Sequence, residues 1–300
     1  MCGIVGLFIK NPAHEDRLGS LVSAMLVEMS ERGPDSAGLA VYRNPTPAGA
    51  LKLVLFSHAP DCNWAQLAQE LEDELGDTVS LEVRASHAIL VVHESFEQIR
   101  HWLKERHPEL RVMSAGHAIE IFKEKGLPKD VVQRFHLTDM AGSHAIGHTR
   151  MATESAVTTE HSHPFSTGMD LCLVHNGSLS NHNRLRQVLR REGGIEFQTD
   201  NDSEVAAGYL TWRMSQGASL HEALEAGLKD LDGFYTFCVG TRDGFAVLRD
   251  PIACKHAVLA ETDDWVAMAT EYRAIAKLPG ADAAKVWEPA PAQVYSWGRA

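Results

Sequence analysis

The sequence opens with MCGIVGLFIK, residues 1–10, and this stretch decides how the rest of the chain is arranged. Between Cys2 and Lys10 every residue is apolar or glycine, and Asn11 and Pro12 then end the run. This is the pattern of a short, fully buried strand. Chain termini are usually loosely ordered, so a buried strand at the first residues predicts an N-terminus that is fixed inside the fold. Cys2, which begins the strand, is therefore expected to occupy a defined place.

Composition excludes several classes of protein. The chain has 300 residues, with 28 Lys and Arg against 40 Asp and Glu, which gives a formal net charge of −12. Without a basic block it lacks the charge that binds nucleic acid or an anionic membrane surface. No apolar stretch approaches the roughly 20 residues of a membrane-spanning helix, and the N-terminus does not resemble a signal peptide. We therefore expect no nucleic-acid partner, no membrane association and a cytoplasmic location.

The five cysteines point to no shared site. They are widely spaced and include no Cys-x-x-Cys pair, so the spacing indicates neither a zinc site nor a disulfide framework. We expect no metal in this chain, and each cysteine has to be interpreted singly.

Residues 50–116 have a pattern of their own. Strand-like and helical stretches follow the order βαββαβ, which is typical of a ferredoxin-like sheet with two helices on one face. We therefore predict an inserted subdomain at 50–116 that divides a main domain formed by 1–49 and 117–300. Residues 117–138 are expected to form a helical stretch that leads back to the main domain. The strand-like stretches are 51–57, 78–84, 87–93 and 110–116, and the helical ones are 64–75 and 96–103.

The main domain is dominated by strand-like stretches from residue 145 onward. Helical stripes occur within 18–29, 203–214 and 220–231. Because strands and helices occur in blocks and do not alternate one by one, the pattern predicts an α+β layered sandwich. The strand-like stretches are 39–42, 145–150, 169–176, 234–240, 244–250, 256–260, 265–270 and 293–298.

Cys2 can carry unusual chemistry. If Met1 is removed, residue 2 has both a thiol, with an ordinary pKa of about 8.5, and an α-amine, with an ordinary pKa of about 7.7 to 8.0. The amine can then accept the thiol proton, so that nucleophile and base belong to one residue. Taken alone, however, Cys2 can equally be just the first residue of a strand.

Three further residues offer complementary groups at strand ends. Asn176 and Gly177 follow the apolar run LCLV, where a side-chain amide and a backbone N–H can form an oxyanion hole. The same Asn-Gly pair is also a strong turn signal. Arg150 ends another strand and offers a guanidinium fork suited to a carboxylate, or to a surface salt bridge.

Three acidic residues precede a helical stripe. Any of Asp200, Asp202 and Glu204 could cap the N-terminus of that helix, and a carboxylate at that position could also receive a substrate ammonium group.

Taken together, six short motifs resemble the class II (N-terminal nucleophile) glutamine amidotransferases. The resemblance covers 1–42 and about 140–298, which is nearly the whole chain outside the insert. The motifs occur in order as CGIVG (2–6), RGPDSAG (32–38), GHTRMAT (147–153), HPF (163–165), HNG (175–177) and NDSEV (201–205).

The resemblance implies a fold and a set of roles. The fold would be the four-layer αββα sandwich of the N-terminal nucleophile hydrolases, with the ferredoxin-like insert attached. Cys2 would be the nucleophile, and Asn176 and Gly177 would form the oxyanion hole. The other residues would bind glutamine or order the site: Arg150 and Thr153 at its α-carboxylate, Asp202 at its α-ammonium group, Arg32 beside the N-terminus, and His163 in the pocket lining.

Within this family, the insert and the block HTRMATESAVTTEHSHPF (148–165) look most like the amidotransferase subunit of glutamate-synthase-like complexes, in particular N-methylglutamate synthase. This implies a glutaminase subunit that hydrolyses L-glutamine to L-glutamate and ammonia through a thioester on Cys2. Because no synthase-like segment follows the last strand-like stretch, we expect the ammonia to pass to a synthase subunit. No cofactor is expected in this chain, whereas FMN and an iron–sulfur cluster are expected on partner subunits.

Two other functions stay open. An N-terminal-cysteine hydrolase of another amide would share Cys2 but would not need Arg150 and Asp202. A catalytically silent scaffolding or binding subunit would retain Met1, because an α-amine in a peptide bond cannot act as a base.

Overall fold

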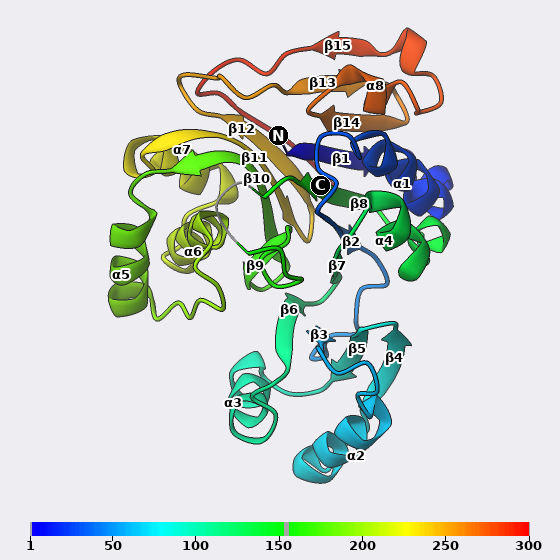
Figure 1. The fold of residues 1–300 in the computed structure, drawn as a ribbon, viewed down its shortest axis with the longest axis vertical. Coiled ribbons are helices and arrows are strands. Elements are labelled where there is room, and N and C mark those ends of the chain that lie inside the picture. Colours follow the sequence, from blue (N-terminus) through cyan, green and yellow to red (C-terminus); the bar gives the residue numbers. More distant parts are fainter. Residues whose placement is uncertain (1, 153–155, 300) are drawn as a thin grey trace.

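A computed structural model of the chain describes residues 2–152 and 156–299, and its strands form three sheets (Figure 1). The first sheet has seven strands in the order β15-β13-β14-β1-β8-β2-β7. Their bounds are β1 Gly3–Ile9, β2 Ser36–Tyr42, β7 Ile119–Lys125, β8 His144–Arg150, β13 Val258–Glu261, β14 Trp265–Ala269 and β15 Lys285–Trp287.

The first strand lies in the middle of this sheet. All seven residues of β1 are buried, and β1 pairs antiparallel with β14 on one side and β8 on the other, so that Val5 lies between Ala269 and Gly147. The buried strand predicted at the start of the chain is confirmed, and it fixes the position of Cys2 at the end of a central strand.

The second sheet has five antiparallel strands in the order β16-β12-β11-β10-β9. Its bounds are β9 Phe165–Gly168, β10 Leu171–Leu179, β11 Gly233–Thr241, β12 Gly244–Arg249 and β16 Val294–Gly298. It packs face to face on the first sheet, with contacts from β10 to β1 and from β11 to β8.

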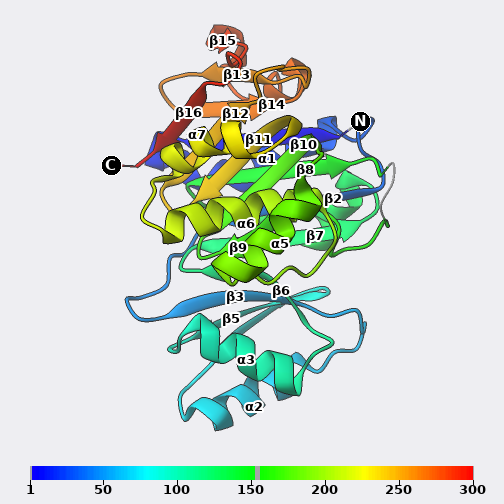
Figure 2. The same ribbon diagram turned by 90° about the vertical axis from the view of Figure 1, so that its left-hand side faces the viewer.

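Helices cover the outer faces of both sheets (Figures 1 and 2). The helices α1 (Leu18–Glu28) and α4 (Pro128–Arg134) lie on the first sheet. The second sheet is covered by α5 (His182–Gly193), α6 (Asp202–Ser215) and α7 (Leu220–Asp230). The predicted α+β sandwich of four layers, αββα, is confirmed. The described part of the main domain also contains four short helices: η1 Pro12–Arg17, η2 Leu137–Asp139, α8 Tyr272–Ile275 and η3 Ala281–Ala283.

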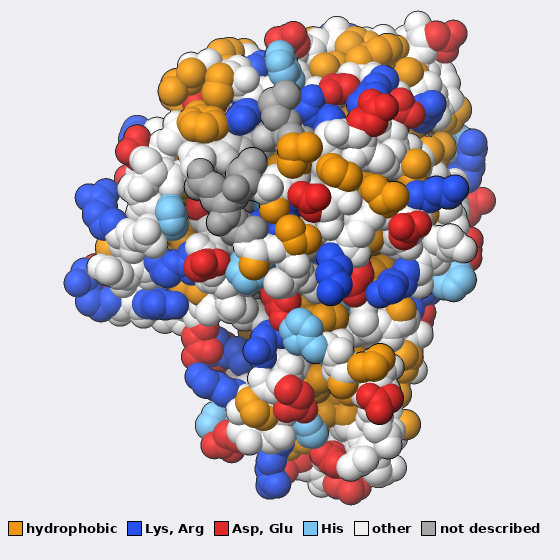
Figure 3. Space-filling model, in the orientation of Figure 1, with side chains coloured by type: hydrophobic (Ala, Val, Ile, Leu, Met, Phe, Trp, Pro, Cys, Tyr) orange, Lys and Arg blue, Asp and Glu red, His pale blue; other side chains and the backbone are white. Residues whose placement is uncertain are grey.

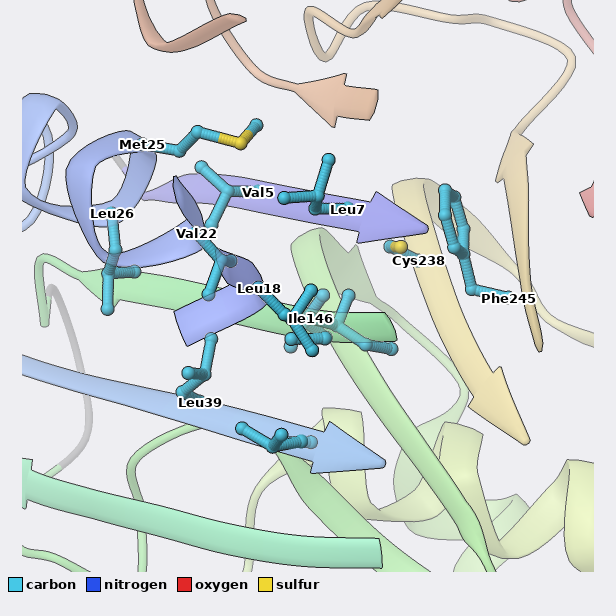
Figure 4. Packing of buried hydrophobic residues seen from close by; sticks show 14 of the residues in the cluster. Val5, Leu7, Leu18, Val22, Met25, Leu26, Leu39, Ile146, Cys238 and Phe245 are labelled. Atoms are coloured by element: carbon cyan, nitrogen blue, oxygen red, sulfur yellow. The ribbon is translucent and has the colours of Figure 1, made fainter. Parts of the chain in front are cut away.

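The core reflects the two-residue alternation of β1. Gly147 on β8 lies against the side chains of Val5, Leu26 and Leu39, which places Val5 on the α1 side of the sheet (Figure 4). Gly6 points the opposite way, because a Cβ added there would lie 3.2 Å from the sulfur of Cys238 on β11. One strand thus contributes to both interior layers, and this accounts for its complete burial.

The third sheet belongs to the insert. It has the antiparallel order β4-β5-β3-β6, and the helices α2 and α3 contribute their apolar sides to its core. This confirms the ferredoxin-like βαββαβ arrangement; the proposed boundaries at residues 50 and 116 stay a prediction. The elements are β3 Leu51–Phe56, α2 Trp64–Leu75, β4 Ser80–Arg84, β5 His87–Val92, α3 Phe96–Arg106 and β6 Arg111–Gly116.

The helix expected across 117–138 is wrong for its first half. Residues 119–125 form the edge strand β7, which pairs with β2, and the helical residues are those of α4 and the start of η2. Ile119 and Ile121 alternate as in a strand. The charged residues Glu120 and Lys123 are buried as well, and both form hydrogen bonds. Buried charges obscure the alternation, so tertiary partners decide this segment.

Within the described part of the chain, no helix combines the length and the apolarity that crossing a bilayer requires.

Candidate active site

Cys2 lies half-exposed at the point where β1 begins. It is a free cysteine, and its sulfur lies 3.9 Å from the backbone oxygen of Met151, just after β8. The thiol therefore lies beside the end of the neighbouring central strand and is accessible from outside.

Two side chains from distant parts of the chain converge on the backbone of Cys2. Arg32 Nε donates to the Cys2 carbonyl oxygen at 3.0 Å, and Asn176 Nδ2 donates to the same oxygen at 3.3 Å. Asn176 belongs to β10 of the second sheet, and Cys2 precedes β1 of the first. The two sheets therefore meet at this residue, and the predicted residues Cys2, Asn176 and Arg32 come together.

Arg32 is held by an acidic residue that the sequence patterns did not single out. Its Nη1 donates to Glu271, which also forms an ion pair with Arg273, whose Nε lies 2.7 Å from a carboxylate oxygen of Glu271. Burial alone would raise the pKa of the Glu271 carboxyl group, but the hydrogen bonds and charges of Arg32 and Arg273 lower it overall. A carboxylate is thus kept charged where it fixes Arg32 against the backbone of Cys2.

Gly177 occupies a position that no other residue can easily fill. Its φ is +153°, and a Cβ added there would lie 2.0 Å from the backbone oxygen of Phe234 on the paired strand β11. Glycine is required because the two backbones approach so closely. Gly177 therefore has no side chain between its backbone and the neighbouring strand β11.

Arg150 ends β8 and is almost completely buried, with 4% of its surface exposed. Its Nη1 donates to the backbone oxygen of Ala156 at 2.9 Å. Burial lowers the pKa of Arg150, while the charges of Cys2, Asp35 and Asp202 act in the opposite direction. The guanidinium group therefore shares one electrostatic environment with Cys2 and Asp202.

Asp35 orders the strand end that carries Arg150. Its backbone N–H donates to the Arg150 oxygen at 3.0 Å, and its carboxylate accepts from the N–H of Ala152 at 2.8 Å. Asp35 belongs to the motif RGPDSAG, which is the sequence signal that could have identified this role. Thr153, predicted to help bind the substrate carboxylate, lies outside the described residues.

Asp202 is the first residue of α6, and both of its oxygens have partners. Oδ2 accepts from the backbone N–H of Leu179 at 2.9 Å, and Oδ1 accepts from Ser203 Oγ at 3.2 Å. The carboxylate joins α6 to the end of β10, just past Asn176. A carboxylate has about four acceptor positions, so these bonds leave capacity for a further donor.

The helix cap is not one of the three acidic residues considered from the sequence. Asn201 is the cap, because its extended backbone lets Oδ1 accept from the N–H of Ser203 at 2.8 Å. Asp200 bonds His161 at 2.9 Å, and Glu204 accepts from Thr199 N–H at 2.8 Å and from its hydroxyl group at 2.7 Å. The acidic residues therefore fix the approach to α6 and leave the cap to Asn201.

His163 lies in a buried histidine cluster between the two sheets. Its ring lies against that of His148 of β8, with the centroids 4.0 Å apart and the planes tilted by 31°. His148 Nε2 is 3.1 Å from the backbone oxygen of His175. Burial lowers the pKa of all three, to about 3 for His148, so they stay neutral. In the sequence, His148 lies two residues before Arg150, and His175 lies directly before Asn176. The two histidines come together only because the two sheets pack face to face.

The described residues contain no group of three or more His, Cys, Asp or Glu side chains placed to hold a metal ion. The groups that do converge are a thiol, an amide donor beside a bare glycine, a buried guanidinium group and a helix-terminal carboxylate. Such a set can attack a carbonyl carbon, stabilise an oxyanion and bind a ligand with both a carboxylate and an ammonium group. The roles predicted for the individual residues stay predictions.

Comparison with known proteins agrees with this chemistry. A family model described as a glutamine amidotransferase domain matches residues 148–277. The chain is 55% identical over 298 residues to the glutamine amidotransferase-like protein GlxB of Rhizobium meliloti (strain 1021), covering 99% of this chain and 98% of that protein. It is 31% identical over 311 residues to a putative glutamine amidotransferase of Methanothermobacter thermautotrophicus, covering 98% and 99%.

Solved structures confirm the fold. The glutamine phosphoribosylpyrophosphate amidotransferase of B. subtilis, complexed with ADP and GMP, matches 99% of this chain with a TM-score of 0.63 and 20% identity. This chain covers 47% of that enzyme, so it spans about half of its length. At this level of identity the likeness concerns the fold alone.

Proposed function

The chain belongs to the class II glutamine amidotransferase family, and from this premise we propose that it hydrolyses L-glutamine to L-glutamate and ammonia. The observation that carries the proposal is the 3.3 Å hydrogen bond from Asn176 Nδ2 to the Cys2 carbonyl oxygen. This bond brings the side-chain amide of Asn176 next to Cys2, the residue that carries the thiol. Gly177, which has no side chain, follows Asn176 directly.

The proposed first step needs removal of Met1. The free α-amine of Cys2 then takes the thiol proton, and the thiolate attacks the side-chain carbonyl carbon of glutamine. A carbon–sulfur bond forms, and the carbonyl oxygen becomes an oxyanion. Asn176 Nδ2 and the Gly177 N–H are the donors for that oxygen, which places them in the role of an oxyanion hole.

In the second step the carbon–nitrogen bond breaks. The α-ammonium group returns its proton to the leaving nitrogen, which departs as ammonia and leaves a γ-glutamyl thioester on Cys2. Water then adds to the thioester with the α-amine as base. The carbon–sulfur bond breaks, glutamate leaves and the thiol is restored, so atoms and protons balance over the cycle.

Substrate binding is assigned to charged groups around the thiol. Arg150, with Thr153, binds the α-carboxylate of glutamine, and Asp202 binds its α-ammonium group. Burial of Arg150 supports this role, because a guanidinium group removed from water binds a carboxylate more strongly. Arg32 orients Cys2 through its carbonyl, and His163 backs the pocket from between the sheets.

The finer proposal concerns the fate of ammonia. We infer that it is delivered to a synthase subunit of a glutamate-synthase-like complex, with N-methylglutamate synthase as the specific candidate. The support is the resemblance of the insert and of the block 148–165 to the amidotransferase subunit of such complexes. FMN and an iron–sulfur cluster are expected on those partner subunits.

The test combines mass spectrometry of the N-terminus with measurement of glutamate released from glutamine, with and without candidate synthase subunits. We expect a chain that begins at Cys2 and whose activity rises when the partners are added. Cys2→Ala should abolish glutamate release without unfolding the protein. Cys62→Ala, which changes another partly exposed free cysteine, should leave glutamate release unchanged.

The outcomes separate the alternatives. A retained Met1 with no glutamate release would identify a silent scaffolding subunit. The chain would be a different N-terminal-cysteine hydrolase if it hydrolysed other amides and if simple carboxylic acids inhibited that reaction as strongly as glutamate. Full activity of the isolated chain would contradict the dependence on a partner.

A further inference from the structure

A cleft separates the insert from the main domain, away from the residues around Cys2. Its volume is about 690 Å³. One wall is formed by α3 and β6 of the insert, and the other by β9, α6 and the segment 193–198 that follows α5. Figure 3 shows the molecular outline hollowed where the insert joins the main domain, with charged side chains gathered at the hollow. A cleft of this size between two subdomains is a usual place for a small ligand.

The insert wall of the cleft carries two cations that share one carboxylate. Arg100 and Lys104 lie one turn apart on α3, so they face the same way. Glu196 on the opposite wall lies 3.7 Å from Arg100 Nη1 and 3.3 Å from Lys104 Nζ. Arg100 Nη2 also donates to Glu97 at 2.5 Å. The two cations are therefore arranged around a carboxylate that reaches them from across the cleft.

The bonds to Glu196 are weak. Strong charge-assisted bonds measure about 2.7 to 2.9 Å, and both distances exceed that range. The side chain of Lys104 is 68% exposed and that of Glu196 is 53% exposed. Exposed ion pairs contribute about 1 kcal/mol or less, so a carboxylate from solution can replace Glu196 at little cost.

A buried hydroxyl group inside the cleft has no partner among the described residues. Ser114 lines the cleft from β6, is 1% exposed, and its Oγ makes no hydrogen bond there. An unsatisfied buried hydroxyl group costs about 1 to 3 kcal/mol. Leu103 and Met214 contribute apolar surface from the two walls. The interior therefore offers apolar contact, and the Ser114 hydroxyl group lies beneath the surface of the wall.

The cleft is held in shape by bonds between the subdomains. The backbone N–H of Asp170, next to β10 in the main domain, donates to the backbone oxygen of Ala115 on β6 of the insert at 2.9 Å. Gln198 Nε2 donates to the backbone oxygen of Val112 across the cleft at 2.8 Å. The walls are thus fixed relative to one another, and a ligand would meet a preformed site.

We propose that this cleft binds a small organic acid, with its carboxylate between Arg100 and Lys104 in the place of Glu196 and its body extending along Leu103 and Met214. The protein's own Glu196 identifies the chemistry, because a carboxylate is the group that the two cations already hold. The proposal is independent of glutamine hydrolysis, since none of its residues lies among those assigned to the reaction.

Titration calorimetry at constant ionic strength tests the site with succinate, malate and citrate. Succinamide, the neutral counterpart of succinate, is the ligand control, and L-glutamate is left out because it is the product of the proposed reaction. We expect saturable binding of one molecule per chain for at least one of the acids and none for succinamide. Failure of all three acids to bind would overturn the proposal.

Variants separate a ligand site from a structural contact between the walls. Arg100→Gln and Lys104→Gln should each weaken acid binding about threefold to fivefold, as expected for exposed ion pairs. Arg106→Gln, on α3 but outside the cleft, should leave binding unchanged. Glu196→Gln should strengthen binding several-fold, because it removes the competing carboxylate. Weaker binding in Glu196→Gln, or unchanged binding in the α3 variants, would contradict the assignment, and circular dichroism checks that each variant is folded.

Discussion

At the scale of single residues, Gly177 joins the fold to the candidate chemistry. It follows Asn176 in β10, and its backbone faces Tyr235 across the sheet. Because Gly177 has no side chain, β10 and β11 can approach each other closely at this residue. The lack of a Cβ also leaves room for the proposed oxyanion to approach its backbone N–H. One glycine therefore serves both strand pairing and the candidate oxyanion hole.

Gly177→Ala should harm both properties. The added Cβ meets the Phe234 oxygen at 2.0 Å in a backbone conformation that side chains disfavour, so we expect the free energy of unfolding to fall by about 3 kcal/mol. Urea denaturation measures this loss, and glutamate release from the folded variant should fall as well.

Gly76→Ala is the matched control for this substitution. Gly76 also has a positive φ, +67°, but nothing lies within 4 Å of its added Cβ. It should cost only about 1 kcal/mol and leave activity intact. Equal losses in the two variants would show that backbone strain, and not the close approach of β11, makes glycine necessary at 177.

At the scale of elements, β7 links the insert to the loop that carries His163. Lys123 on β7 is buried, and its Nζ donates to the backbone oxygens of Glu160, Ser162 and Pro164 at 3.1, 2.8 and 3.1 Å. Burial lowers the pKa of Lys123 to about 8, against the raising effect of nearby carboxylates. This edge strand therefore fixes a loop beside the candidate site from outside that site.

Lys123→Met should loosen that loop. The variant keeps most of the side-chain volume but leaves three backbone oxygens without their donor. We expect faster amide hydrogen exchange in residues 158–164 and a fall of about tenfold in kcat for glutamate release, which is about 1.4 kcal/mol.

Lys125→Met provides the comparison, because Lys125 is the exposed last residue of the same strand. It should change neither the exchange of the loop nor kcat. Unchanged exchange in Lys123→Met would mean that the rest of the fold holds the loop without the lysine.

At the scale of the whole molecule, buried neutral histidines make stability depend on pH. Burial lowers the pKa of His87 to about 3, of His144 to about 4 and of His148 to about 3. His87 belongs to β5 of the insert, whereas His144 and His148 both belong to β8 of the first sheet, so the effect involves both parts of the fold. In the unfolded chain each would titrate near 6.5.

The sign of the pH dependence follows from these values. Above pH 6.5 the three histidines are neutral in both the folded and the unfolded state, so they do not lower the free energy of unfolding. As the pH falls from 6.5 toward 3 to 4, the unfolded chain binds protons that the folded chain does not, so stability decreases. At pH 5 each contributes a loss of about 2 kcal/mol, about 6 kcal/mol in all. Urea denaturation between pH 7 and 5 measures this loss.

Replacing one histidine should reduce the slope. His87→Gln is expected to remove about one proton from the pH dependence below pH 6.5, whatever its effect on stability at pH 7. His101→Gln, at an exposed position on α3, should leave the slope unchanged. A slope that stays the same in His87→Gln would show that the histidine also titrates in the folded state.

The sequence by itself determined what depends on neighbouring residues. Apolar continuity identified β1, the order of strands and helices identified the ferredoxin-like insert, and short motifs identified Cys2, Asn176 and Arg32, which the fold brings together. Periodicity and the special backbone of glycine are local properties, and a linear sequence displays them directly.

Only the tertiary structure decided what depends on partners far away in the chain. The sequence predicts a helix where β7 forms, because the buried charged side chains of β7 form hydrogen bonds with residues far away in the chain. Asn201 caps α6, and Glu271 holds Arg32 from 239 residues away. The clustering of His163 with the histidines of β8 and β10 required two sheets to meet. Burial and charge pairing arise from such contacts, and local sequence does not contain them.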